Sequence, residues 1–113
     1  WVCKCMTTDI GYYFNMDQIK ADPWNSPEKM WQHSPLKYAN MAKTPTLFIQ
    51  SDEDYRCWMG DAIQMFSALK YFGVEARMCL FHGENHELSR SGKPKHRIRR
   101  MTEMMEWFEK YLK

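Results

Sequence analysis

The segment TLFIQSDED, residues 46–54, decides the fold. Its first five residues form a short apolar run after Pro45, which is typical of a buried strand. Its last four residues form a polar, acidic loop at the C-terminal end of that strand. A second strand is predicted over residues 74–81, where apolar residues at 76, 78 and 80 alternate with Arg77, Cys79 and Phe81.

Helical patterns follow both predicted strands. Residues 58–72 have helical spacing on one apolar face, and Gly73 stands where a helix C-cap belongs. A last helix is predicted over residues 97–112. Its apolar stripe consists of Ile98, Met101, Met105, Phe108 and Leu112. Strand, helix, strand, helix at this spacing favours two parallel strands joined by a crossover helix.

The chain is predicted to be one unit, residues 1–113, with two unlike parts. Residues 1–44 combine loops with short helices, including one from Ser26 to about His33 that opens on Ser-Pro. Residues 45–113 form the βαβα unit. A parallel sheet of two strands needs neighbours to cover its faces. The fold class is therefore α/β, and the sheet is expected to be an incomplete part of a larger one.

Composition limits the classes of protein to consider. The chain has 113 residues, of which 44% are hydrophobic and 27% charged, as in ordinary globular domains. These values exclude a disordered tail, a collagen-like chain and a coiled coil. No apolar run approaches the length of a membrane span, so no membrane partner is expected. The first residue is Trp1 and no signal-peptide pattern follows it, so we expect a trimmed or partial cytoplasmic product.

The charge of the chain is small but unevenly distributed. The formal net charge is +2. Residues 90–100 contain six basic residues and no acidic one: Arg90, Lys93, Lys95, Arg97, Arg99 and Arg100. A solvated loop running into a helix explains this stretch, and a contact with a partner or subunit is the alternative. Nucleic acid is not expected, because no aromatic residues are interleaved for base stacking.

The four cysteines do not indicate a cofactor. Cys3 and Cys5 lack C-x-x-C spacing, and Cys57 and Cys79 stand alone. This pattern favours neither zinc nor a disulfide scaffold, so reduced thiols are expected and no metal or other cofactor is predicted.

Acidic residues and histidines follow the two predicted strands. Asp52 and Asp54 follow the first strand, and His82 and His86 follow the second. Active-site residues of open parallel sheets lie in such loops. An acid followed by a histidine is the order found in the Ser, Asp/Glu, His triad of α/β-hydrolases. The pattern alone also fits solvated loop residues.

Several segments resemble one family of enzymes. Residues 45–56, PTLFIQSDEDYR, resemble the strand and acid loop of the prolyl oligopeptidase family of serine peptidases. Residues 83–94, GENHELSRSGKP, are similar to the histidine loop of that family, especially in acylaminoacyl-peptidases. Residues 8–14 and 34–39 resemble segments that precede the acid in the same subgroup. The resemblance implies the C-terminal portion of an α/β-hydrolase fold.

The resemblance also implies roles for two residues. By position, Asp54 would be the acid and His86 the base of a Ser-Asp-His triad. Asp52 is the competing acid. His82 is the competing base, but it is expected to be a partly buried strand residue.

Other residues near the acid have expected structural roles. Arg56 is expected to hold the acid loop by an ion pair, and His33 and His96 are expected to be structural or solvated. Trp58 departs from the family pattern, which usually has proline there. That departure is expected to change the start of the following helix.

The sequence lacks a recognisable nucleophile. None of its glycines, at 11, 60, 73, 83 and 92, frames a serine as G-x-S-x-G. The resemblance implies that the serine and the oxyanion hole come from an upstream segment, and that this chain alone is inactive. Expected partners are a peptide or acyl-peptide substrate in the complete enzyme, and either the remainder of the catalytic domain or another copy. The alternative is a self-associating α/β module, dimeric or domain-swapped, without hydrolase activity.

Overall fold

Two parallel strands lie at the centre of the molecule. The computed structural model describes residues 1–112, so Lys113, the last residue of the predicted unit, lies outside the described residues. Strand β1 (Thr46–Ser51) pairs with β2 (Ala76–Phe81) in parallel, with Thr46 opposite Ala76 and Ser51 opposite Phe81. This confirms the predicted strands and their direction.

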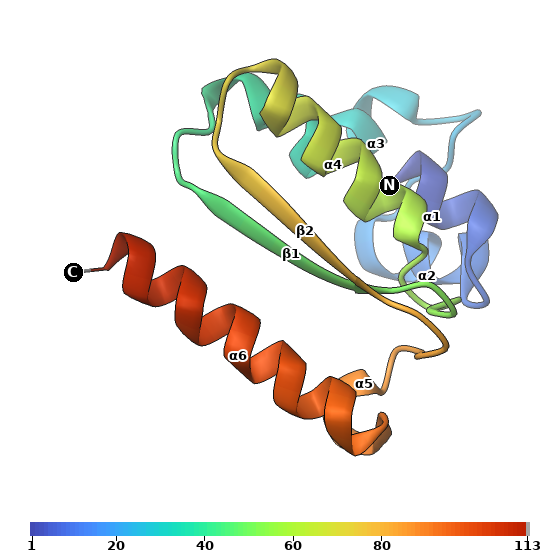
Figure 1. The fold of residues 1–113 in the computed structure, drawn as a ribbon. Helices are drawn as coiled ribbons and strands as arrows, with labels where there is room; N and C mark the ends of the chain where they lie inside the picture. The colour runs from blue at the N-terminus through green and yellow to red at the C-terminus, as the bar shows by residue number, and fades with distance from the viewer. Residues whose placement is uncertain (113) are drawn as a thin grey trace.

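Helices cover the two faces of this small sheet. Helix α4 (Met59–Tyr71) lies on one face and helix α6 (Pro94–Tyr111) on the other, as Figure 1 shows. Leu69 of α4 is buried against Val74 and Ala76, and Phe48 of β1 meets Phe66 of α4 edge to face. Burial of these apolar side chains fixes α4 on the sheet.

The link between α4 and β2 explains why β2 begins two residues later than predicted. The C-cap of α4 is Phe72, one residue before the predicted Gly73. Gly73 follows it with φ of +76°, the left-handed conformation that glycine adopts without strain after a helix. The Val74 amide then donates to the Leu69 carbonyl (2.9 Å). Val74 therefore closes the helix end, the Glu75 carbonyl accepts from the Thr46 amide (2.9 Å), and β2 itself begins at Ala76.

The first 44 residues contain more helix than predicted. They form α1 (Val2–Thr7), α2 (Gly11–Ile19), α3 (Pro27–Gln32) and the 3₁₀ helix η1 (Pro35–Met41). Helix α3 agrees with the helix predicted from Ser26 to about His33. The sequence also suggests single turns at residues 16–21 and 36–41, which α2 and η1 extend, whereas α1 was not predicted. A small core supports them, formed by Cys5, Ile19, Ala21 and Met30 with Trp1 packed against it. Tertiary contacts therefore stabilise helices whose sequence shows no clean helical period.

The long loop after β2 also contains unpredicted helix. Helix α5 (Leu88–Ser91) forms a single turn, and α6 begins at Pro94 rather than Arg97. The side chain of Asn85 accepts a hydrogen bond from the Glu87 amide (2.8 Å), which turns the chain into α5. Pro94 occupies the first turn of α6, where its missing N–H costs nothing.

Helix α6 presents its apolar stripe to solvent. Its five predicted stripe residues, Ile98, Met101, Met105, Phe108 and Leu112, are all exposed large hydrophobics. The buried residue of α6 is instead Glu103, which is 3% exposed and pairs with Arg77 of β2 (2.8 Å) and with Arg99. A contiguous exposed apolar face of this kind is typical of a surface that meets another part of a protein. The described sheet is thus incomplete, as predicted.

Candidate active site

The acid loop (residues 52–57) follows β1 and fixes one carboxylate. Asp54 is only 7% exposed. Its Oδ1 accepts hydrogen bonds from the backbone amides of Arg56 (3.0 Å) and Cys57 (2.8 Å). The side-chain amide of Gln50 donates to the carbonyl of Cys57 (2.9 Å) and so ties this loop to the end of β1. The carboxylate of Asp54 therefore has a defined orientation, with Oδ2 free to face another partner.

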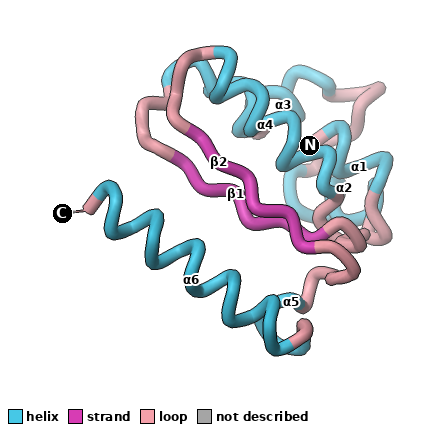
Figure 2. Tube along the Cα trace, in the orientation of Figure 1, coloured by secondary structure: helices cyan, strands magenta, loops and turns pink. Residues whose placement is uncertain are grey.

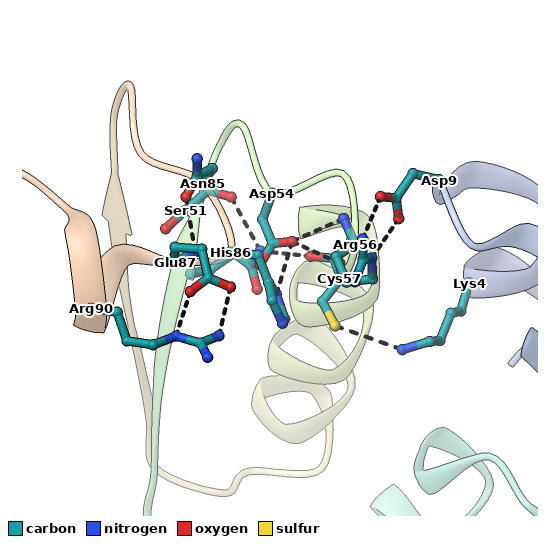
Figure 3. A network of polar contacts seen from close by, with 11 residues as sticks. Lys4, Asp9, Ser51, Asp54, Arg56, Cys57, Asn85, His86, Glu87 and Arg90 are labelled. Carbon is teal, nitrogen blue, oxygen red and sulfur yellow. Dashed lines mark hydrogen bonds and ion pairs between the residues drawn. The ribbon is translucent and has the colours of Figure 1, made fainter.

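The histidine loop (residues 82–87) follows β2 and provides His86, which contacts the Asp54 carboxylate. Figure 2 shows both loops at the same end of the two strands. Nδ1 of His86 lies 3.0 Å from Oδ2 and 3.2 Å from Oδ1 of Asp54 (Figure 3). Because an ionised carboxylate only accepts hydrogen bonds, Nδ1 carries the ring proton. Nε2 is then left with its lone pair, on a side chain that is 42% exposed. Such a nitrogen is able to take a proton from a neighbouring hydroxyl.

A second acid–histidine pair lies at the same sheet end, in a different environment. Nδ1 of His82 lies 2.8 Å from Oδ2 of Asp52, and the Gly83 amide donates to Oδ1 (2.8 Å). The hydrogen bond from His82 lowers the pKa of Asp52. The His82 side chain is 81% exposed, so its prediction as a partly buried strand residue is wrong. Since β2 ends on the buried Phe81, the next side chain points outward.

Arg56 holds the acid loop to the N-terminal helices. Its Nε and its guanidinium NH₂ lie 2.7 and 2.9 Å from the two carboxylate oxygens of Asp9 (Figure 3). The Asp9 amide also donates to the carbonyl of Tyr55 (2.9 Å). The hydrogen bonds with Arg56 lower the pKa of Asp9. The expected ion pair of Arg56 is thus present, and its partner is the turn between α1 and α2.

The comparison with known protein families places the whole chain in one family. The family model described as the prolyl oligopeptidase family matches residues 1–113. The chain belongs to the prolyl oligopeptidase family. This identification confirms the family resemblance of the sequence, and it covers the whole chain rather than the two loops alone.

Individual relatives give the extent of the likeness. The uncharacterized peptidase YuxL of Bacillus subtilis is 39% identical over 112 residues, which are 99% of this chain and 17% of the relative. The acylamino-acid-releasing enzyme of Arabidopsis thaliana is 35% identical over 82 residues, 73% of this chain and 10% of that protein. This prolyl oligopeptidase family chain therefore spans less than a fifth of the relatives it matches.

A solved structure shows the same fold. The uncomplexed acylaminoacyl peptidase of Pyrococcus horikoshii matches with a TM-score of 0.91 and 36% identity, over 96% of this chain and 18% of that one. An acylaminoacyl peptidase in complex with Z-Gly-Gly-Phe-chloromethyl ketone matches equally well. The predicted class, the C-terminal portion of an α/β-hydrolase fold with an incomplete sheet, is confirmed.

The sequence did not predict one acid–histidine pair, Glu84 with His96. Glu84, two residues before His86, is 6% exposed, and its Oε1 lies 2.6 Å from Nδ1 of His96. His96 lies in the first turn of α6 and packs edge to face against Phe81. It is therefore structural, as is His33, whose Nδ1 contacts the Lys29 carbonyl (2.8 Å). A loop residue and a helix residue twelve positions apart give no sequence signal for such a pair.

Trp58 lies directly before α4, in a loop whose Asp54 contacts His86. Helix α4 begins at Met59 directly after Trp58, whose ring stacks on Tyr55 with centroids 5.9 Å apart. A Cβ at Gly60 would lie 3.0 Å from the Trp58 ring, so the glycine makes room for the indole. Trp58 thus packs against the first turn of α4.

The remaining thiol and acidic groups of residues 1–112 do not form a metal-binding cluster. Cys3, Cys5, Cys57 and Cys79 are free thiols. Burial raises the pKa of the Cys3, Cys5 and Cys79 thiols. Within residues 1–112, no three His, Cys, Asp or Glu side chains lie together as metal ligands would. None of the helices described there is both long and apolar enough to span a membrane.

Proposed function

We propose that this chain supplies the acid and the base of a Ser-Asp-His triad in a serine peptidase of the acylaminoacyl-peptidase type. Asp54 is the acid and His86 is the base. The observation that carries the proposal is the pair of contacts from Nδ1 of His86 to the buried, doubly hydrogen-bonded Asp54 carboxylate. The acid of such a triad fixes the tautomer of the histidine and stabilises the imidazolium that forms.

The proposed reaction follows from the free Nε2 of His86. Nε2 takes the proton of a serine hydroxyl as that oxygen attacks the carbonyl of an acylated peptide. The resulting imidazolium, stabilised by Asp54, gives its proton to the leaving amine as the C–N bond breaks. Water then attacks the acyl-enzyme, with Nε2 again as the base, and releases the acid and the serine.

The nucleophile has to come from another segment in this proposal. No serine of the 113 residues stands in a G-x-S-x-G elbow, which is the turn that exposes the nucleophile in α/β-hydrolases. The chain by itself is therefore inactive. Its partner is the remainder of a catalytic domain, which would complete the sheet and meet the exposed apolar stripe of α6. Self-association over that stripe is the competing outcome.

Joining the chain to a serine-bearing segment tests this proposal. In the experiment, residues 1–113 replace the matching 18% of the Pyrococcus horikoshii acylaminoacyl peptidase, whose backbone they follow at a TM-score of 0.91. We call this protein the joined enzyme. It is expected to hydrolyse an N-acylated peptide ester, whereas neither the 113-residue chain nor the truncated remainder does so alone. Hydrolysis by the isolated chain, at the rate of the joined enzyme, would contradict the proposal. Native mass spectrometry of the isolated chain checks for self-association.

A further inference from the structure

The His86 ring depends on its loop for its position. Its Nδ1 is held by Asp54, but 42% of the side chain is exposed. A half-exposed ring is not fixed by packing, so the backbone of the histidine loop has to place it. The question is therefore which residue holds this loop against the acid loop.

Glu84 contacts three separate segments. Its backbone carbonyl accepts a hydrogen bond from the Glu53 amide in the acid loop (3.0 Å). Its side-chain Oε1 accepts one from the Lys93 amide (3.0 Å), just before α6, and meets Nδ1 of His96 in α6 (2.6 Å). One residue thus joins the acid loop, the histidine loop and the start of α6.

The carboxylate of Glu84 has little room to move. A Cβ at Gly92 would lie 2.9 Å from Oε2 of Glu84 and 2.5 Å from the Leu88 carbonyl oxygen, so only a glycine fits there. The carboxylate therefore packs directly on the backbone that leads into α6. A shift of Glu84 would require a shift of that backbone.

The charge of Glu84 is compensated where it is buried. Burial raises its pKa, but the hydrogen bonds from His96 and from the Lys93 amide outweigh this effect and leave that pKa below its ordinary value. The Glu84 carboxylate therefore accepts hydrogen bonds from both groups through Oε1.

We propose that Glu84 is a positioning residue, which holds the histidine loop against the acid loop and α6 and so places His86 on Asp54. The inference rests on the proposed function, because it assigns Glu84 to the same site. Glu84 touches no reacting atom. It acts through its neighbour two residues along, and its loss lets the His86 ring leave the Asp54 carboxylate.

Three substitutions in the joined enzyme separate this role from simple stability. Glu84→Ala removes the carboxylate, and Glu84→Asp keeps the charge but shortens its reach to Lys93 and His96. Both are expected to lower kcat by about 10- to 100-fold, with KM close to the parent value, because a small displacement of a catalytic group has effects of this size. Glu84→Gln keeps an acceptor oxygen at full length and is expected to restore most of the activity.

Glu87 provides the matched control. It follows His86 directly, but its carboxylate pairs with Arg90 within the turn of α5, as Figure 3 shows. Glu87→Ala is expected to keep the parent kcat. Rates are normalised to the folded fraction, measured by gel filtration and circular dichroism. If Glu84→Ala does not fold, Glu84→Asp gives the answer.

The outcomes are distinguishable from those of the proposed function. Parent-like kcat in Glu84→Asp, equal to that of Glu87→Ala, would overturn the positioning role while leaving the triad intact. A loss of kcat in Glu84→Gln as large as in Glu84→Ala would also overturn it. The loss would then not come from removing an acceptor oxygen that reaches Lys93 and His96. If His86→Ala itself kept the parent kcat, the triad would be wrong instead.

Discussion

His86→Ala in the joined enzyme is expected to lower kcat by about 10⁴-fold or more, because it removes the proton acceptor of the serine. The Nδ1 contacts to Asp54, 3.0 and 3.2 Å, leave Nε2 as the nitrogen that takes that proton. KM is expected to change little, since the ring binds no part of the substrate away from the reacting bond. Steady-state hydrolysis of an N-acylated peptide ester checks both values.

His82→Ala is the control for this result. His82 has the same pairing with a carboxylate, 2.8 Å from Asp52, and follows the same strand. Its side chain is 81% exposed, and its partner Asp52 accepts one backbone hydrogen bond, from Gly83, whereas Asp54 accepts two. We expect His82→Ala to retain the parent kcat. Loss of activity in His82→Ala with full activity in His86→Ala would transfer the base to the other pair.

Asp54→Asn is expected to lower kcat by about 10⁴-fold, because it favours the wrong tautomer of His86. The amides of Arg56 and Cys57 both donate to Oδ1 of Asp54, so the amide oxygen of an asparagine takes that place. Its NH₂ group then takes the place of Oδ2, 3.0 Å from Nδ1 of His86. Nδ1 has to accept this hydrogen bond, so the proton moves to Nε2. That nitrogen is then no longer a base.

Asp52→Asn is the matched substitution on the competing acid. It changes the exposed pair with His82 and leaves the hydrogen bonds of Asp54 intact, so its kcat is expected to stay near that of the parent. Thermal unfolding of both variants checks that they are folded. An inactive Asp52→Asn beside an active Asp54→Asn would make Asp52 the acid.

The sequence predicted the elements that position the candidate site. The apolar run at residues 46–50 and the alternation at 74–81 predicted both strands, and the helical spacing over 58–72 predicted α4. Because parallel strands end at one edge of a sheet, the loops with Asp54 and His86 were expected to meet, and the structure brings them together. The choice of Asp54 over Asp52 came from the family resemblance. The distances alone would not have made it, because both acid–histidine pairs form at similar lengths.

The features that the sequence did not predict depend on contacts far along the chain. Helix α1 and the first turns of α2 are supported by packing such as Trp1 on Phe14, which no local pattern reveals. The pattern of α6 was recognised, but Glu103 rather than the apolar stripe faces β2, because Arg77 of that strand provides its partner. The Glu84–His96 pair joins a loop to a helix, and nothing in the spacing marks it.

The most direct test of the central claim is to identify which histidine a peptidyl chloromethyl ketone alkylates in the joined enzyme. Z-Gly-Gly-Phe-chloromethyl ketone, which is bound in one of the matching acylaminoacyl peptidase structures, is a suitable reagent. The lone pair of an unprotonated ring nitrogen forms a bond to the methylene carbon as chloride leaves. The account predicts alkylation of Nε2 of His86, loss of activity in step with the label, and no labelling in His86→Ala. Stoichiometric alkylation of His82, or inactivation with His86 unmodified, would contradict it.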